Sequence, residues 1–311
     1  MTAKEAEMDP KALHRWTVER WAELVAAVDE DQWDLPTPCA DWTVRELVNH
    51  VVGEELWTVP LVGGATIEEV GNRFDGDLLE ADPTGVALSA AAAAADAADK
   101  ADDEIQVHLS FGETDLGEYL YQLAADHLIH GWDLAVATGG LRELDPQAVD
   151  AVASWFRERE ELYREGGAIG PRQALTGNPA ADLLGAFGRA VDWGPNHAAL
   201  ARFSAAFGAG DVDAIMALMT DDCVFESTGP APDGNRIEGQ ADVRKVWEDL
   251  FGGSGDAQFD EEESFVYGDR AVLRWRYAWT NGDGSPGHVR GVDVLRLRDG
   301  KVAEKLSYVK G

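Results

Sequence analysis

One short stretch constrains this chain more than any other. Asp126-His127-Leu128-Ile129-His130-Gly131-Trp132-Asp133 places carboxylates and imidazoles inside an otherwise apolar helical run. At 3.6 residues per turn, Asp126, His130 and Asp133 project from one face of a helix. That face can hold a metal ion, but one helix cannot complete the site, because a divalent ion takes at least three protein ligands and unpaired polar groups are costly in an apolar interior. A further ligand must come from elsewhere.

The missing ligand is expected on a helix that begins near residue 43. Thr43-Val44-Arg45-Glu46 has the spacing of a capping box, in which the threonine hydroxyl and the glutamate carboxylate satisfy opening amides of the helix. His50 and Glu54 share a face of that helix. His50 is therefore the candidate third ligand, and Glu54, one turn behind it, is a candidate acid or base.

The first part of the chain shows further helical patterns. Apolar residues recur at helical spacing over residues 10–29, and an Ala-rich helix over about 84–105 precedes a fourth helix over about 115–138, which Gly139-Gly140 ends. Four helices of these lengths predict an all-α four-helix bundle whose site lies between facing helices.

Length and charge narrow the class of protein. A chain of 311 residues exceeds what one core usually organises, so we expect two domains, residues 1–193 and 194–311. The formal charge of −32, from 58 acidic and 26 basic residues, would repel a nucleic acid or an anionic membrane surface. The polar N-terminus and the two distant cysteines, Cys39 and Cys223, favour a cytoplasmic protein without a signal peptide or membrane span.

Residues 37–50 and 126–135 resemble the DinB-like superfamily. Within it, the chain is most similar to actinobacterial metal-binding proteins related to the N-terminal domain of mycothiol-dependent maleylpyruvate isomerase, and the resemblance covers about residues 10–193. It implies a metal bound by His50, Asp126 and His130, where the isomerase has a glutamate in place of Asp126. It also implies mycothiol, or another low-molecular-weight thiol, as a cofactor.

Two imidazoles and one carboxylate leave an open position on a tetrahedral metal, which is the arrangement of catalytic zinc. Asp133, one turn beyond His130, is expected to orient a ligand imidazole from behind. His127 lies about 100° around the helix from Asp126, so we expect it to pack or bond elsewhere. The alternatives are that it supports the ligands from behind, or that it replaces a ligand if the helical register differs. Cys39 is expected to be a small buried residue in a Pro-rich turn, with a thiolate ligand as the alternative.

The pattern changes after Trp193-Gly194-Pro195. Helices are predicted over residues 196–208, 212–218 and 241–251, with a strand over 224–227. Residues 261–267, 270–280, 287–298 and 302–309 then alternate with a period of two, and Asp299-Gly300 is a strong hairpin signal. These features predict an α+β domain in which a curved antiparallel sheet wraps over helices and leaves an apolar pocket.

Residues 201–211, 218–225, 237–239 and 294–304 look like a SnoaL-like, nuclear transport factor 2-like domain. The resemblance implies a cone-shaped fold, which hosts isomerases, cyclases, hydrolases and binding or dimerisation modules. In the strand 289–298, Asp293 falls on the apolar face, opposite Arg290, Arg296 and Arg298. Asp293 is therefore either a base for proton transfer or a structural carboxylate bonded to a backbone amide.

Three functions follow. The first is a zinc-dependent isomerase or transferase that uses a mycothiol-type thiol on a small electrophile, with the second domain supplying a pocket or a homodimer contact. The second is isomerase or cyclase chemistry in the C-terminal pocket with Asp293 as base. The third is a non-catalytic metal- or ligand-binding protein. In each case the expected partner is a small molecule.

Overall fold

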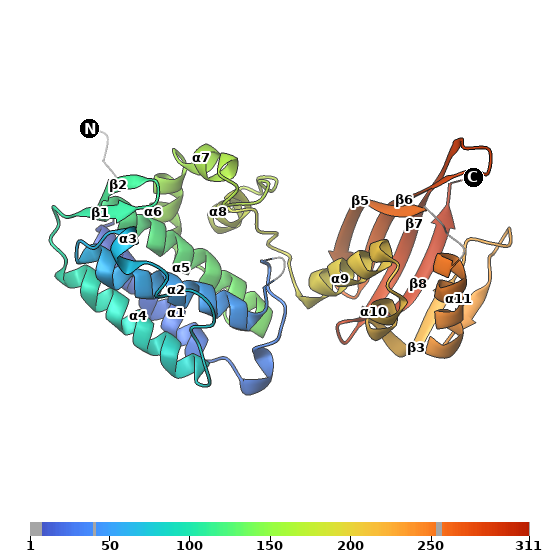
Figure 1. Cartoon of the computed structure of the whole chain (residues 1–311), viewed down its shortest axis with the longest axis horizontal. Coiled ribbons are helices and arrows are strands. Elements are labelled where there is room, and N and C mark those ends of the chain that lie inside the picture. Colours follow the sequence, from blue (N-terminus) through green and yellow to red (C-terminus); the bar gives the residue numbers. More distant parts are fainter. Residues whose placement is uncertain (1–7, 40–41, 253–256, 311) are drawn as a thin grey trace. The chain divides into compact units, whose positions relative to one another are not determined.

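The computed structural model describes residues 8–39, 42–252 and 257–310. The chain divides into two units between Trp193 and Gly194. Figure 1 shows helices in the first unit and a sheet covered by helices in the second.

The N-terminal unit is built on α1 (Pro10–Ala26), α2 (Val44–Val62), α4 (Pro83–Lys100) and α5 (Leu116–Thr138). Both α1 and α2 pack against α4 and α5. Almost every residue of α5 after its first turns is buried, as expected of a helix that is apolar all round. The predicted helical fold of this region is confirmed, and α5 is its central element.

Caps fix where the two site-bearing helices begin. The Thr43 hydroxyl accepts from the Glu46 amide, and the Glu46 carboxylate accepts from the Thr43 amide, so the predicted capping box is present at α2. Asp115 caps α5, which ends at Gly139 with a φ of 78°, a left-handed conformation that glycine adopts without strain. These ends set the register of the residues between them.

The remaining elements of this unit are short. A 3-10 turn (Glu30–Gln32) follows α1, and α3 (Ile67–Val70) lies in the acidic connection. The hairpin of β1 (Gln106–Leu109) and β2 (Gly112–Asp115) follows α4, which therefore ends five residues before the predicted 105. Beyond α5, the chain forms α6 (Pro146–Phe156), α7 (Glu160–Glu165) and α8 (Pro179–Ala186). The helix α6 contacts both α5 and α8.

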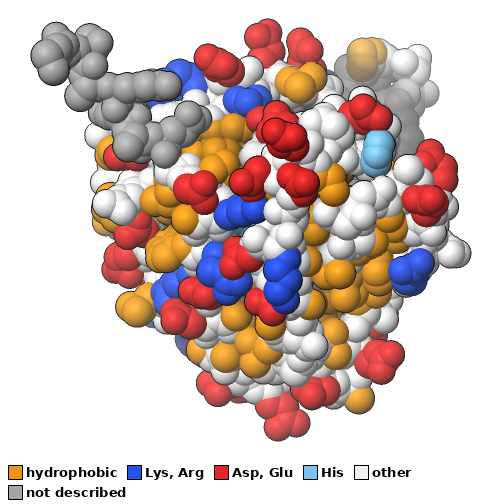
Figure 2. Space-filling model, turned by 90° about the vertical axis from the view of Figure 1, so that its left-hand side faces the viewer, with side chains coloured by type: hydrophobic (Ala, Val, Ile, Leu, Met, Phe, Trp, Pro, Cys, Tyr) orange, Lys and Arg blue, Asp and Glu red, His pale blue; other side chains and the backbone are white. Residues whose placement is uncertain are grey.

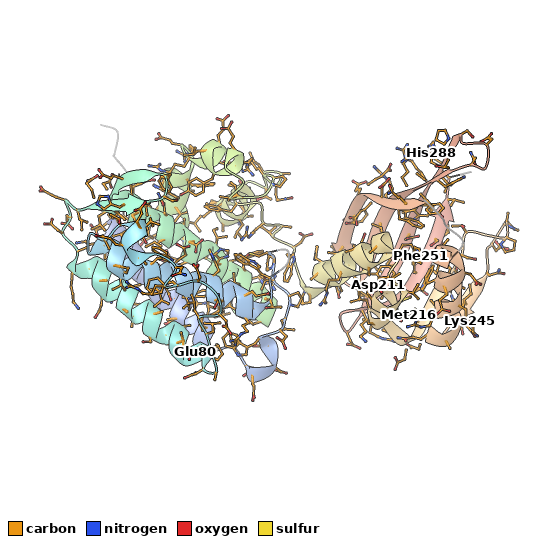
Figure 3. All side chains as sticks on the ribbon, viewed as in Figure 1. Glu80, Asp211, Met216, Lys245, Phe251 and His288 are labelled. Atoms are coloured by element: carbon orange, nitrogen blue, oxygen red, sulfur yellow. The ribbon has the colours of Figure 1, made fainter. Side chains whose placement is uncertain are left out.

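The C-terminal unit contains a six-stranded sheet with the order β4-β3-β8-β7-β6-β5. Its strands are β3 (Met219–Glu226), β4 (Arg236–Glu238), β5 (Gln258–Tyr267), β6 (Arg270–Thr280), β7 (Pro286–Arg298) and β8 (Lys301–Val309). The helices α9 (Pro195–Ala209), α10 (Val212–Ala217) and α11 (Gln240–Gly252) lie against one face of this sheet. Met216, labelled in Figure 3, belongs to the core between the helices and the sheet, and Phe251, also labelled there, is partly buried and packs against this core.

The sheet is mixed, which corrects the predicted antiparallel sheet. β5, β6, β7 and β8 form an antiparallel meander, as expected, but β3 runs parallel to β8. A parallel pair needs a long crossover connection, and here the chain passes through β4, α11 and the meander before it returns beside β3. The alternation of side chains predicts a strand but not the direction of its neighbour.

Acidic side chains are spread over the face of the N-terminal unit drawn in Figure 2, with few lysines and arginines between them. They do not gather into one patch there. Within the described ranges, no helix combines the length and the apolar character that a membrane span requires.

Candidate metal centre

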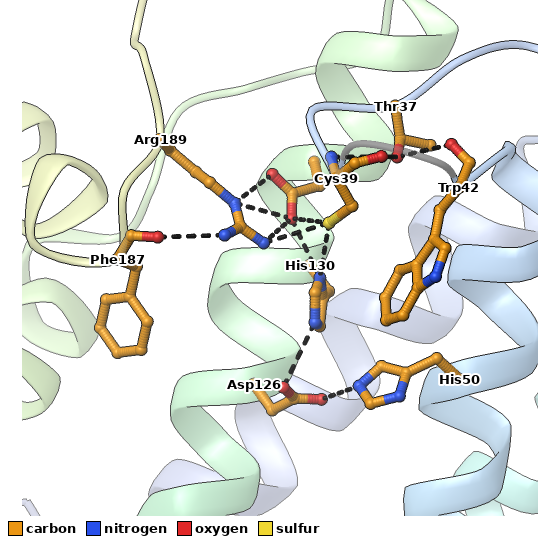
Figure 4. Close-up of polar contacts among 9 residues, drawn as sticks. Thr37, Cys39, Trp42, His50, Asp126, His130, Phe187 and Arg189 are labelled. Atoms are coloured by element: carbon orange, nitrogen blue, oxygen red, sulfur yellow. Dashed lines mark hydrogen bonds and ion pairs between the residues drawn. The ribbon is translucent and has the colours of Figure 1, made fainter. Parts of the chain in front are cut away.

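The three predicted ligands meet between α2 and α5. His50 projects from α2 toward Asp126 and His130, which lie one turn apart on α5 (Figure 4). Asp126 Oδ2 lies 3.6 Å from His50 Nε2, and Asp126 Oδ1 lies 3.3 Å from His130 Nε2. One donor atom from each residue falls within 4.8 Å of the others. The fold therefore brings two imidazoles and one carboxylate to a single point.

These residues fit a divalent cation. The Oδ2 atom of Asp126 is buried and has no hydrogen-bond partner among the described residues. A buried carboxylate oxygen is normally hydrogen-bonded, so this one leaves an acceptor that a cation or a water molecule could use. Two histidine nitrogens and a carboxylate oxygen are a donor set that zinc accepts.

Charge at the centre is set by the carboxylate and the imidazole together. Burial alone would raise the pKa of Asp126, but His130 and then His50 outweigh it and hold that pKa well below its ordinary value. Burial alone would lower the pKa of His130, but Asp126 and then Asp133 outweigh it and hold that pKa well above its ordinary value. Asp126 is thus ionised, as a metal ligand must be, and a cation at His130 Nε2 would replace a proton.

Asp133 and Arg189 stand behind His130. Asp133 is fully buried, and its Oδ2 lies 2.9 Å from His130 Nδ1. Arg189 donates to the same carboxylate, from Nη2 to Oδ2 at 2.7 Å and from Nε to Oδ1 at 3.0 Å. Because Asp133 holds Nδ1, the Nε2 atom of His130 is the one that faces Asp126. Asp133 therefore lies where a residue that orients a ligand imidazole should lie.

Arg189 did not emerge from the sequence as a site residue. It follows α8 and is 56 residues away from Asp133, in a part of the chain without a strong periodic pattern. One signal was available: a carboxylate predicted inside a bundle needs a cationic partner, because an uncompensated buried charge is strongly destabilising. That requirement predicts a basic residue nearby but does not identify it.

Cys39 lies on the same side of His130 as Asp133. Its Sγ is 3.2 Å from Arg189 Nη2 and 3.4 Å from Asp133 Oδ2. Cys39, His130 and Asp133 could also offer three donor atoms to a metal. The Arg189 guanidinium contacts both Cys39 and Asp133 and already supplies the positive charge, so a second cation there would be repelled. The group formed by His50, Asp126 and His130 is thus the better metal site.

His127 bonds elsewhere, as expected from its position on the helix, and the alternative role of supporting the ligands is not observed. It is 2% exposed, its Nδ1 lies 2.7 Å from the Leu123 carbonyl oxygen, and its Nε2 lies 3.2 Å from Glu55 Oε1. The next position along a helix is rotated by about 100°, which turns His127 away from the face of Asp126. His127 and Glu55 instead form a buried pair beside the centre.

The surroundings of His50 include Glu54, the Trp42 ring and an approach from solvent. Burial, and then the charge of Asp126, raise the pKa of Glu54 above its ordinary value, which favours its protonated form. The Trp42 ring lies 4.9 Å from the His50 ring and 5.9 Å from the His130 ring between centroids. An open hollow of about 740 Å³ reaches His50 along Trp42 and Arg45.

Asp293 lies in the C-terminal unit. It is 2% exposed and faces the core, as the alternation of β7 predicts. Its Oδ2 lies 2.8 Å from Lys305 Nζ, and its Oδ1 accepts a hydrogen bond of 2.6 Å from Ser307 Oγ. Its partners are thus side chains of β8, whereas the sequence reading offered a backbone amide. The cross-strand register opposes Asp293 and Ser307, which the sequence alone does not reveal.

Comparisons with known proteins agree with the two units. Residues 14–135 match the mycothiol maleylpyruvate isomerase N-terminal domain, and residues 200–305 match a SnoaL-like domain. Uncharacterized proteins from two strains of Mycobacterium tuberculosis are 33% identical over 181 residues, which cover 56% of this chain and 87% of each relative.

Solved structures of the nuclear transport factor 2-like class are also similar. A protein of unknown function from Mesorhizobium loti is 40% identical, with a TM-score of 0.34, and the match covers 38% of this chain and 92% of that one. Another, from Cytophaga hutchinsonii, is 17% identical, with a TM-score of 0.33 and coverage of 36% and 97%. The chain thus belongs to the mycothiol maleylpyruvate isomerase N-terminal domain family through its first unit, and its second unit is a SnoaL-like domain.

Proposed function

We propose that this protein binds zinc through His50, Asp126 and His130 and catalyses a thiol-dependent isomerisation or transfer on a small electrophile. One observation carries the proposal: the Asp126 carboxylate lies between two imidazoles, and its buried Oδ2 atom has no hydrogen-bond partner among the described residues. Membership of the isomerase domain family supports the choice of a mycothiol-type thiol. The SnoaL-like unit is then an accessory domain, which supplies a second pocket or a homodimer contact.

Each residue of the centre has a separate task. A divalent ion held there would act as a Lewis acid toward a water or thiol molecule. His50 and His130 would provide neutral nitrogen donors, and Asp126 would provide a negative charge that offsets part of the ion's charge. Asp133 fixes which nitrogen of His130 faces the centre, and Arg189 fixes Asp133. Glu54 is the group that would accept or release a proton beside His50.

The metal is tested by elemental analysis of the purified full-length protein. We expect about one zinc ion per chain in the wild type and loss of most of it in His50→Ala and His130→Ala. His108→Ala is the matched control, because His108 also lies beside a carboxylate, Glu113 at 3.4 Å, but on the β1–β2 hairpin. Absence of metal from the wild type, or full occupancy in both ligand variants, would refute the proposal.

The thiol is tested separately. Mass spectrometry of the native protein should reveal a bound low-molecular-weight thiol, and turnover of a panel of small electrophiles should require both the thiol and the metal. Tight binding of the thiol without turnover of any electrophile would instead support the non-catalytic alternative, in which the bundle stores or senses a ligand.

Chemistry at Asp293 is the less favoured alternative. The carboxylate is already engaged by Lys305 and Ser307, and a base must be free to take a proton from its substrate. An activity that survives chelation of metal but disappears in Asp293→Asn would reverse this preference.

A further inference from the structure

The N-terminal unit contains a pocket between α1 and α5, called the α1–α5 pocket below. Its walls come from α1, from α5 and from residues 141–144, which follow α5. Its volume is about 290 Å³, at the lower end of the range for ligand pockets, so it suits a small molecule. The candidate metal centre lies between α5 and α2 instead. The proposed zinc chemistry therefore does not use this pocket.

The floor of the α1–α5 pocket is largely apolar. Leu128, Gly131 and Trp132 of α5 line it, and all three are buried. A Cβ atom on Gly131 would lie 3.3 Å from Leu24 Cδ1 of α1, so the absence of a side chain there lets the two helices come together and close the floor. The floor thus offers an occupant apolar and aromatic surface.

Two polar side chains that line the pocket already have partners in the bundle. The Nδ1 and Nε2 atoms of His127 lie 2.7 Å from the Leu123 carbonyl oxygen and 3.2 Å from Glu55 Oε1. The Thr17 hydroxyl donates to the His14 carbonyl oxygen at 2.9 Å. Breaking these buried contacts would be costly. An occupant therefore finds its polar partners nearer the surface.

Large apolar side chains are exposed around the mouth of the pocket. Trp16 is 37% exposed and Leu141 is 70% exposed, and both line the pocket. Single exposed apolar residues are common on protein surfaces and need no explanation. Here the two lie around one pocket whose floor is also apolar, and exposed apolar surface that continues into a pocket marks a binding site. An apolar molecule in the pocket would shield this surface from water.

Two arginines in the wall have hydrogen-bond donors to spare. Arg20 lies four residues after Trp16, so both side chains are on one face of α1. Its Nη1 donates to Glu23 at 3.0 Å, in an exposed pair of the kind that contributes little to stability. The Arg142 side chain is exposed and makes no ion pair or hydrogen bond with a described residue. A guanidinium binds a carboxylate well, because its planar N–H groups match the two oxygens.

Charge at the pocket favours an occupant with one negative group. Arg20 and Arg142 bring two positive charges, and among the described residues that line the pocket Glu143 brings one negative charge, which leaves one positive charge in excess. A single carboxylate balances it. The net charge of −32 repels anions at long range. At 0.1 M salt, however, charges more than about 10 Å apart are largely screened, whereas the two guanidiniums act at contact.

We infer that the α1–α5 pocket binds a small, apolar carboxylic acid in its ionised form. The apolar body of the acid lies against Trp16, Leu128 and Trp132, and its carboxylate accepts hydrogen bonds from the two arginines. The inference goes beyond the proposed function and does not rest on the metal centre. Its failure would leave the proposed zinc chemistry untouched.

The test is titration calorimetry of the full-length protein at pH 7 in 0.1 M sodium chloride. The probe is naphthoate, and the reference is naphthamide, which has nearly the same shape without the charge. We expect naphthoate to saturate the wild type and to bind about tenfold more tightly than naphthamide, because hydrogen bonds to a charged acceptor are about twice as strong as neutral ones. Arg20→Gln and Arg142→Gln should each weaken naphthoate by about five- to tenfold and leave naphthamide unchanged.

Arg157→Gln is the matched control. Arg157 is an exposed arginine of the same unit, at the end of α6, and does not line the pocket. Its replacement changes the net charge by the same amount and should not change the affinity for naphthoate. Trp16→Ala should weaken naphthoate and naphthamide alike, because it removes apolar wall and no charge. Naphthoate that does not bind, that binds no more tightly than naphthamide, or that binds equally well to both pocket variants would overturn the inference.

Discussion

Asp133 shows how much of the candidate centre depends on a residue that would not touch a metal bound there. It is fully buried and accepts from Arg189 while it holds His130. Residues that orient a metal ligand in this way typically contribute 10- to 100-fold in affinity, that is, roughly 1.4–2.7 kcal/mol. Its removal should weaken binding while all three ligands remain in place.

We therefore expect Asp133→Asn to lower the affinity for zinc by about 10- to 100-fold, because the amide cannot supply the charge that faces His130 and Arg189. Competition with a chromophoric chelator measures this. Asp293→Asn is the control, since Asp293 is equally buried and paired with a cation, but in the other unit. Equal zinc affinity of Asp133→Asn and the wild type would contradict the assigned role.

A second residue, His14, is expected to make the stability of the protein depend on pH. It is fully buried in α1, and neither ring nitrogen has a hydrogen-bond partner among the described residues. Burial, and then the neighbouring His127, lower the pKa of His14 from 6.5 to about 3. Between these two values the unfolded chain binds a proton that the folded protein does not bind. The contribution of His14 is therefore constant above pH 6.5 and is lost progressively as the pH falls toward 3.

His14→Leu should remove this dependence. Each pH unit inside that window costs the wild type up to about 1.4 kcal/mol through this one residue. The free energy of unfolding, measured by urea denaturation at pH 7 and pH 5, should thus fall less in the variant than in the wild type. Other titrating groups contribute to both proteins and cancel in the comparison. Identical losses would show that His14 is not held neutral.

The meeting of His50, Asp126 and His130 could be predicted from sequence because it follows from helical spacing and from a family motif. His130 and Asp126 are one turn apart on one helix, and His50 stands seven residues after a capping threonine. Arg189 and Lys305 could not be predicted in the same way. Each is brought to its partner by the packing or register of elements that are distant in the sequence. No local sequence pattern predicts which distant residue will lie beside a given carboxylate.

At the scale of elements, helix caps are easier to predict than the relative directions of paired strands. The capping box at Thr43 was readable because its two partners are only three residues apart. The β1–β2 hairpin was missed because strands of four residues are too short to show a period. The parallel pairing of β3 with β8 was missed because pairing is a tertiary choice.

The contribution of the capping box at α2 to the stability of the protein can be measured. Thr43→Ala removes the acceptor for the Glu46 amide and should lower the free energy of unfolding by about 1 kcal/mol. Thr66→Ala is the matched control, since Thr66 and Glu69 form the same box on α3, a helix of only four residues. We expect a smaller loss there, because little packing depends on that helix. If Thr66→Ala lost as much free energy of unfolding as Thr43→Ala, the contribution of a cap would come from its own hydrogen bonds alone and would not depend on the packing of its helix.

At the scale of the whole molecule, the dominant property is charge. With 58 acidic and 26 basic residues, at least 32 carboxylates have no basic counterpart. Many of the remaining charges form exposed ion pairs, such as Arg244 with Asp213 and Lys245 with Asp242. Exposed pairs contribute about 0–1 kcal/mol each. Repulsion among the unpaired carboxylates acts in the opposite direction and destabilises the folded state.

Salt screens both the attraction within exposed ion pairs and the repulsion among unpaired carboxylates. The change in stability when salt is added therefore shows which of the two is larger. Raising the ionic strength from about 0.01 M to 0.1 M shortens the screening length from about 30 Å to about 10 Å, which removes long-range repulsion before it weakens contacts of a few ångströms. We therefore expect the midpoint of urea denaturation to rise with sodium chloride over this range. Urea is suitable because it is uncharged and leaves the ionic strength unchanged.

Sucrose at matched osmolality, without added salt, separates screening from a general solute effect. If repulsion dominates, the rise with sodium chloride should level off once the screening length falls below the spacing between neighbouring carboxylates, whereas stabilisation by sucrose should continue to grow with concentration. A midpoint that falls as salt is added would show that the surface ion pairs outweigh the repulsion. In that case the folded state would tolerate its excess of acidic residues even at low salt.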